Sequence, residues 1–84
     1  MEDYQLSDHA KDVMKEREIS WRWIMETIMN PTLILRDEVD GNLEHSLAPI
    51  PDFGERVLRV IRNVGANPKK VVTAYFDRKM RGKL

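Results

Sequence analysis

The chain has 84 residues and a mass of 9.9 kDa, which allows one domain with one modest hydrophobic core. Hydrophobic residues make up 42% and charged residues 33%, so the composition excludes a disordered chain, and no apolar run of about 18 or more residues is present that would span a membrane. The absence of cysteine excludes disulfides, thiolate metal sites and thiol nucleophiles. The first residues lack the pattern of a secretion signal, and we therefore expect a cytoplasmic protein.

The formal net charge of zero conceals an uneven distribution of charge along the chain. Residues 1–55 carry 13 acidic and 5 basic residues, a balance of −8. Residues 56–84 carry 9 basic residues and a single acid, Asp77, a balance of +8. This division predicts one basic surface that can bind an anion. The alternative is that the two halves neutralise each other in the folded protein.

Two helices are predicted in the first part of the chain. Ser7 is a candidate N-cap for a helix over residues 8–17, whose apolar side chains recur at helical spacing. Ser20 is a candidate N-cap for a second helix from Trp21, whose apolar residues follow the i, i+3, i+4, i+7, i+8 pattern of a core-facing helix. Pro31 ends this helix, because the residue before a proline is pushed out of the α region.

The remaining apolar residues have the pattern of β-strands. Four strands are predicted, over residues 32–36, 43–48, 56–62 and 71–76. Residues 37–42 have turn chemistry, and residues 49–54 are expected to form a loop because they hold two prolines. The prediction is an α+β fold over residues 1–84, with two N-terminal helices packed on one face of a four-stranded antiparallel sheet. A flexible basic tail is expected at about residues 78–84.

Most classes of catalytic site lack their motifs in this sequence. There is no glycine-rich phosphate loop, no His-Glu-x-x-His pair and no carboxylate cluster with calcium spacing. His9 and His45 are the only histidines, and two imidazoles without thiolates do not make a metal site. We therefore expect neither a metal nor a cofactor.

The residues that remain suit cleavage of RNA through its own 2′-hydroxyl, which needs a base, cations and a proton donor but no metal. His9, at the start of the first helix, is the candidate base, and Arg17 and Arg59 are the candidate cations. Thr73 or Tyr75 is the candidate donor. The alternatives are that His9 bonds a backbone group at the helix edge and that the stem of Arg17 only covers the core.

Two further groups of residues are candidates for binding. The basic residues expected to hold the RNA backbone are Arg56, Arg62, Arg78, Lys79 and Arg81. Their alternative is a solvated run of charge. Trp23 is expected to project away from the apolar face of its helix, as an exposed indole that contacts a protein partner. Its alternative is partial cover by Arg22 or by the N-terminal segment.

The register of the last two strands decides which candidate residues share a face. If Arg59 pairs with Thr73 and Val57 with Tyr75, then Arg59, Thr73 and Tyr75 lie on one face of the sheet. A slip of one residue would place Arg59 opposite Ala74 and separate the set. The sequence leaves this register open.

Taken in order, short motifs along the chain resemble a domain-of-unknown-function family that is grouped with the RelE- and BrnT-like toxins, within the barnase-like ribonucleases. The motifs are His9-Ala10, Met14, Glu16-Arg17-x-Ile19-Ser20, Asn30-Pro31, Leu58-Arg59-Val60-Ile61 and Val72-Thr73-Ala74-Tyr75-Phe76. The resemblance spans about residues 4–81 and implies two helices on an antiparallel sheet. It also implies a toxin that cuts RNA without a metal and is neutralised by an antitoxin, with His9, Arg17, Arg59, Thr73 and Tyr75 at the matching positions.

Two functions are therefore predicted. The first is a metal-independent ribonuclease toxin of a toxin–antitoxin pair, and the alternative is a non-catalytic module on the same fold that binds nucleic acid or protein. The expected partners are RNA, free or on the ribosome, and an antitoxin that covers the basic face with an acidic segment or adds a strand to a sheet edge. A homodimer is also expected to be accessible through the open sheet face, and no membrane is expected as a partner.

Overall fold

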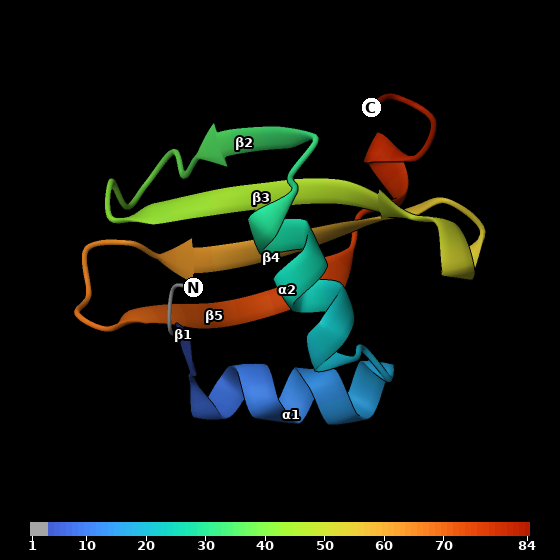
Figure 1. Ribbon diagram of the computed structural model, residues 1–84. Coiled ribbons are helices and arrows are strands. Elements are labelled where there is room, and N and C mark those ends of the chain that lie inside the picture. Colours follow the sequence, from blue (N-terminus) through green and yellow to red (C-terminus); the bar gives the residue numbers. More distant parts are fainter. Residues whose placement is uncertain (1–3) are drawn as a thin grey trace.

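The computed structural model describes residues 4–84 and shows two helices packed against a twisted sheet (Figure 1). The elements in chain order are β1 (Tyr4–Leu6), α1 (Asp8–Arg17), α2 (Trp21–Met29), β2 (Leu33–Arg36), β3 (Leu43–Ile50), the 3-10 turn η1 (Pro51–Phe53), β4 (Arg56–Asn63), β5 (Lys69–Phe76) and the 3-10 turn η2 (Arg78–Met80). The strand order in the sheet is β1-β5-β4-β3-β2. The predicted α+β class and both predicted helices are confirmed.

The predicted four-stranded antiparallel sheet is wrong. Within residues 4–84 the sheet has five strands, and β1 runs parallel to β5. With only three residues, β1 is too short to show the alternation of apolar and polar side chains that marks a strand. Ser7 continues the connection, because its backbone N–H donates to Val71 at 3.0 Å and its hydroxyl donates to the carbonyl of Val72 at 2.8 Å. Tertiary contacts, rather than a local pattern, set this parallel pair.

Both helices begin at the serines that the sequence indicates. The Ser7 hydroxyl accepts a hydrogen bond from the Ala10 N–H at 3.0 Å, and the Ser20 hydroxyl accepts one from the Trp23 N–H at 3.1 Å. Each bond satisfies a backbone donor that the first helical turn leaves free. Glu18 ends α1 in the left-handed conformation, at φ 54°. The two short helices therefore have fixed ends.

The hydrophobic core lies between the helices and one face of the sheet. Its fully or nearly fully buried residues are Ala10, Ile19, Ile24, Ile28, Ile50, Leu58, Val60, Val71 and Ala74. Because side chains alternate along a strand, the neighbours of Leu58, Val60 and Ala74 point to the other face. That second face carries several of the predicted site residues.

The expected loop at residues 49–54 begins two residues later than predicted. β3 continues through Pro49, which pairs with Val57, to Ile50, and the chain then turns through η1. β2 accompanies β3 only as far as Leu47, so one side of the strand at Pro49 has no ladder partner. A proline is tolerated in a strand at such a position, because no partner requires its missing N–H.

Arg59 pairs with Tyr75, and Ile61 pairs with Thr73. The sequence leaves two registers open, with Arg59 opposite Thr73 or opposite Ala74. Neither is observed, since the first differs from the observed pairing by two residues and the second by one. A shift of two residues preserves the faces of a sheet. Arg59, Thr73 and Tyr75 therefore lie on one face, the face turned away from the helices.

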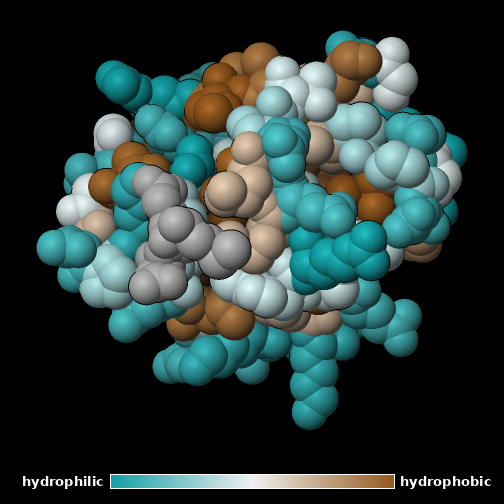
Figure 2. All heavy atoms as spheres, in the orientation of Figure 1, coloured by the Kyte–Doolittle hydropathy of each residue, from teal (hydrophilic) through white to brown (hydrophobic). Residues whose placement is uncertain are grey.

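The surface of the helix-bearing side is hydrophilic with separate hydrophobic patches (Figure 2). Exposed apolar side chains include Ile34 and Leu35 on the edge strand β2, and Trp21 and Met29 on α2. Neither α1 nor α2, the helices of the described residues, combines the length and the apolar character needed to cross a membrane.

Candidate nucleic-acid interface

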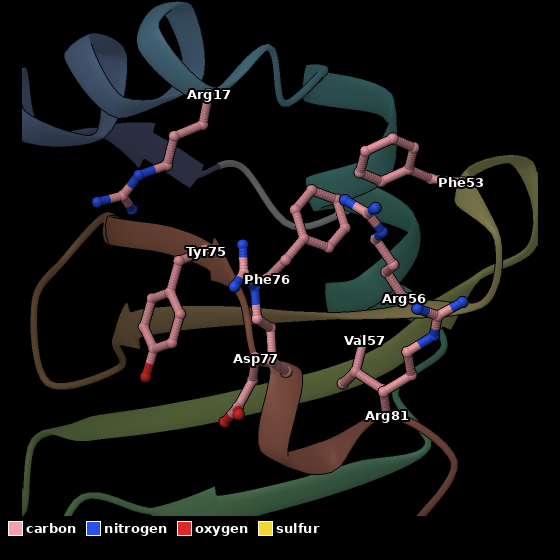
Figure 3. Close-up of a pocket in the computed structure, with 9 residues that line it drawn as sticks. Arg17, Phe53, Arg56, Val57, Tyr75, Phe76, Asp77 and Arg81 are labelled. Atoms are coloured by element: carbon pink, nitrogen blue, oxygen red, sulfur yellow. The ribbon is translucent and has the colours of Figure 1, made fainter.

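A hollow of about 760 Å³ lies at the end of the sheet where β4 begins and β5 ends (Figure 3). Its lining residues are Arg17, Phe53, Arg56, Val57, Tyr75, Phe76, Asp77, Arg78 and Arg81. Four of these nine residues are arginines and one is an acid. We call this site the arginine hollow.

The four arginines come from three separate parts of the chain. Arg17 is the last residue of α1, Arg56 is the first residue of β4, and Arg78 and Arg81 belong to the segment that begins with η2. The sequence cannot show that these residues meet, because α1 and η2 are brought together only by their contacts with the sheet. The hollow therefore depends on the tertiary fold.

Three of the arginines are held in place by groups that carry no net charge. Arg17 donates to the backbone carbonyl of Ala74 at 2.9 Å, and Arg81 donates to the carbonyl of Gly54 at 3.1 Å. The guanidinium of Arg56 lies 4.4 Å from the centre of the Phe53 ring, a cation–π contact. These contacts orient each guanidinium and leave its charge uncompensated.

The acid in the lining, Asp77, is neutralised by a base from outside the hollow. Its Oδ2 lies 3.0 Å from Nη2 of Arg59, and the two side chains are only 14% and 15% exposed. The other oxygen of Asp77 accepts the backbone N–H of Lys79 at 3.0 Å and so caps η2. Each oxygen of the Asp77 carboxylate therefore already has a partner, its charge is paired with Arg59, and the arginines of the hollow keep their positive charge.

An aromatic cluster lies beside the hollow. The ring of Trp23 is stacked on Phe53 with centroids 5.6 Å apart, and it meets Phe76 edge to face at 6.0 Å. The expectation of an exposed indole with no core to join is wrong, because Trp23 is half-buried and, like Phe76, packs against the hydrophobic core. The stack of Trp23, Phe53 and Arg56 extends from the core to the rim of the hollow. Contact of Trp23 with a protein partner stays a prediction.

Arg59 is the centre of a hydrogen-bonded chain that crosses the open face of the sheet. Its Nη1 lies 2.8 Å from Nδ1 of His45, and Nε2 of His45 lies 2.8 Å from Oδ1 of Asp37. Together with the Arg59–Asp77 ion pair, these contacts link the turn after β2, then β3 and β4, to the residue that follows β5. We call Asp37, His45, Arg59 and Asp77 the cross-sheet relay.

Asp37 is a strong acceptor at the far end of this relay. Its carboxylate accepts the backbone N–H of Asp40 at 2.9 Å, the His45 ring and the N–H of Val39 at 3.1 Å. In that order of importance, these hydrogen bonds favour the ionised form and hold the pKa of Asp37 below its usual value. The carboxylate therefore remains an acceptor for the histidine well into the acidic range.

The structure brings some of the predicted catalytic residues together and separates others. Arg17 and Tyr75 line the hollow, and Arg59 lies beside them as the register partner of Tyr75. Thr73 shares the sheet face of Arg59 and Tyr75 two ladder pairs further along, opposite Ile61. His9 is exposed in the first turn of α1 and makes no hydrogen bond or ion pair within residues 4–84. Because eight residues separate it from Arg17, it lies about 12 Å away along the helix.

The structure also separates the predicted RNA-binding residues into those at the hollow and one that is buried elsewhere. Arg56, Arg78 and Arg81 line the hollow, and Lys79 is exposed next to it on η2. Arg62 is 7% exposed and lies on the helix side of the sheet, where it bonds the Tyr4 hydroxyl at 2.9 Å and Glu44 at 3.0 Å. This burial leaves Arg62 with almost no surface for an RNA chain.

The role of His45 and its partners Asp37 and Asp77 is not among the sequence predictions. One signal was present, since His45 and Arg59 occupy facing strands that are expected to be neighbours.

No group of three or more histidine and acidic side chains that could hold a metal ion occurs among residues 4–84.

The fold and the hollow define a small α+β domain with a cationic site at one end of its sheet. The family model described as "Domain of unknown function (DUF4258)" matches residues 6–76, so the chain belongs to this family. No curated protein and no solved structure matches the chain.

Proposed function

We propose that the protein binds single-stranded RNA in the arginine hollow. The observation that supports this proposal is the convergence of four arginines on a hollow whose one carboxylate, among the described residues, is already paired with Arg59. Each guanidinium has five N–H donors, and the contacts of Arg17 and Arg81 occupy one donor each. The remaining donors can hold phosphate oxygens in pairs.

The spread of charge favours a chain of phosphates over a single small anion. Arg56 and Arg17 come from different sides of the hollow, and Arg78 and Arg81 come from a third segment. Cations distributed in this way suit successive phosphates of a backbone, each neutralised with release of counterions. Arg78 makes no ion pair within residues 4–84 and is exposed, so it is free to meet a phosphate.

The aromatic stack at the rim of the hollow favours a single strand over a duplex. Bases in a single strand are free to stack on aromatic rings or on guanidinium planes, whereas bases in a helix are already stacked on each other. Arg56, backed by Phe53 and Trp23, presents such a plane at the rim of the hollow. We expect a single-stranded oligonucleotide to bind more tightly than a duplex of the same sequence.

The experiment is fluorescence anisotropy with a labelled single-stranded RNA of mixed sequence in EDTA. Arg78→Gln should weaken binding about fivefold, which corresponds to about 1 kcal/mol. The matched control is Arg36→Gln, which removes the same charge from the opposite end of the sheet, where Arg36 pairs with Glu44 in the ladder. No binding by the wild type, or equal losses in the two variants, would contradict the proposal.

Metal-independent cleavage of the bound RNA is the second candidate function. Tyr75 lines the hollow with Arg17 and Arg78, so a phenol that can donate a proton and cations that can stabilise charge share one site. The same reactions in EDTA, examined for fragments that end in a 2′,3′-cyclic phosphate, test this candidate. Tyr75→Phe should abolish the fragments and preserve binding, and fragments from both proteins would exclude Tyr75 as the donor.

His9 is the base that the sequence predicts for this cleavage, and the family resemblance includes it among the matching positions. Its distance from Arg17 along α1 means that the two side chains would contact different parts of one RNA chain. His9→Ala, tested beside Tyr75→Phe, decides whether it takes part. A toxin role and an antitoxin that covers the hollow with acidic residues are predictions that depend on this activity. A homodimer stays a separate prediction.

A further inference from the structure

Within the cross-sheet relay, the contacts of His45 define its protonation state. A guanidinium has no acceptor, so the contact between Arg59 Nη1 and His45 Nδ1 at 2.8 Å requires a lone pair on Nδ1. The proton of the neutral ring is then on Nε2, where it is donated to Asp37 at 2.8 Å. Both nitrogens are occupied and the side chain is only 12% exposed, so His45 is placed to orient its neighbours and not to reach a substrate.

We infer that His45 is a positioning residue for the arginine hollow, which it serves through Arg59 and Asp77, and that its protonation weakens the binding of RNA phosphates. This inference rests on the proposed function of the hollow. His45 and Asp77 hold the two ends of the Arg59 fork, at 2.8 Å and 3.0 Å. Asp77 in turn caps η2 through the Lys79 N–H and precedes Arg78 directly. The relay therefore fixes the start of the segment that carries Arg78 and Arg81.

Protonation of His45 would place an N–H and a positive charge against Arg59. Two donors and two like charges at 2.8 Å cannot persist, so the guanidinium must move. Asp77 then loses its fixed contact with the Arg59 guanidinium, which orients its carboxylate. The charged groups that contact His45 are Asp37 from the turn after β2 and Arg59 from β4, and Asp77 after β5 acts on it through Arg59. Its ladder neighbours, Leu35 and Ile61, carry no charge.

The expected change in RNA affinity on protonation of His45 is opposite to the ordinary effect of added positive charge. An additional positive charge near a phosphate site normally strengthens RNA binding. If His45 positions the hollow, lowering the pH from 7.5 to 5.5 should instead weaken binding by about threefold, since part of a charge-assisted contact is lost. His45→Gln is permanently neutral, and its RNA affinity should not fall over this range.

A second variant makes the pH test decisive even if His45→Gln does not fold. Arg59→Lys retains the charge that pairs with Asp77 but lacks a fork that can bridge to His45, and it too should lose the acid-dependent weakening. His9→Gln leaves His45 as the only histidine and should retain that weakening. Parallel pH profiles for the wild type, His45→Gln and Arg59→Lys would overturn the inference.

Nuclear magnetic resonance separates this inference from the proposed function, because it needs no RNA. At pH 7.5 the ¹⁵N shifts of His45 should show a protonated Nε2 and a bare Nδ1. The Lys79 amide signal, whose proton Asp77 accepts, should move with acid in the wild type and not in His45→Gln. A proton on Nδ1, or a Lys79 signal that behaves identically in both proteins, would overturn the positioning role even if RNA binds. Failure of the wild type to bind RNA would overturn the proposed function, whereas these signals would still decide the relay.

Discussion

Arg59 Nη2 lies 3.0 Å from Asp77 Oδ2, so a base outside the arginine hollow neutralises the acid inside it. This relationship explains why the hollow remains cationic although the protein as a whole has no net charge. The uneven charge of the sequence is thus not cancelled everywhere on folding. It is concentrated at the junction of α1, β4 and η2.

The salt dependence of RNA binding should report the contribution of Arg78. Each phosphate contact to a single strand adds about 0.7 to the magnitude of the slope of log affinity against log salt concentration. Arg78→Gln should therefore reduce the slope by about 0.7, whereas Arg36→Gln should leave it unchanged. Anisotropy titrations at several potassium chloride concentrations measure both slopes. An equal reduction in the two variants would show that only overall charge matters.

The two tryptophans of α2 should contribute very differently to stability. Trp23 packs against Phe53, Phe76 and the core, whereas Trp21 is 39% exposed. Trp23→Ala should lower the free energy of unfolding by about 2 to 4 kcal/mol. Trp21→Ala should lower it by about 1 kcal/mol or less. Urea unfolding of both variants tests this, and a larger loss for Trp21→Ala would contradict the packing of the aromatic cluster.

The two helix-capping serines offer a matched pair with one difference. Ser20 only caps α2, so Ser20→Ala should cost about 1 kcal/mol of stability. Ser7 caps α1 and also donates to the Val72 carbonyl across the sheet edge, so Ser7→Ala should cost about 2 kcal/mol. Thermal or urea unfolding measures the difference. Equal losses would mean that the Ser7–Val72 bond adds nothing.

Asp37 should make the stability of the protein depend on pH in the acidic range. Because folding lowers the pKa of Asp37, its ionised form stabilises the native state at pH values above the usual aspartate pKa of about 3.9. This contribution is lost as the pH falls through the lower pKa of the folded protein. The gap in urea midpoint between the wild type and Asp37→Asn should therefore be largest near pH 6 and should shrink toward pH 2.5. A gap that is constant with pH would contradict the hydrogen bonds assigned to Asp37.

Local chemistry in the sequence predicts much of this fold. The serine caps and the helical spacing define both helices, and alternation places Arg59, Thr73 and Tyr75 on one face even though their register was open. The parallel strand β1 was missed because three residues have no readable period and their partner lies more than 60 positions away. The sequence predicts a loop at Pro49, because the end of β2, which makes a proline acceptable in β3, is a tertiary feature.

The candidate site was less predictable than the fold. The sequence identifies the arginines by their type, but the hollow exists only because the end of α1 and η2 meet at the same end of the sheet. Trp23 was misplaced because its aromatic partner Phe53 follows two prolines in a segment with no periodicity. The sequence gives His45 no role beyond that of an excluded metal ligand, because its contacts with Asp37 and Arg59 depend on a register that the sequence does not fix.

RNA binding in the arginine hollow can be tested by a ¹H–¹⁵N titration with a short single-stranded RNA in EDTA. We expect the largest shifts on the backbone amides of Gly54, Val57, Tyr75 and Arg81 and on the side-chain Nε signals of Arg17, Arg56 and Arg78. Signals of Arg36 and of the turn after β2, at the opposite end of the sheet from Arg56, should move little. Shifts centred on that turn, or no shifts at all, would contradict RNA binding in the arginine hollow.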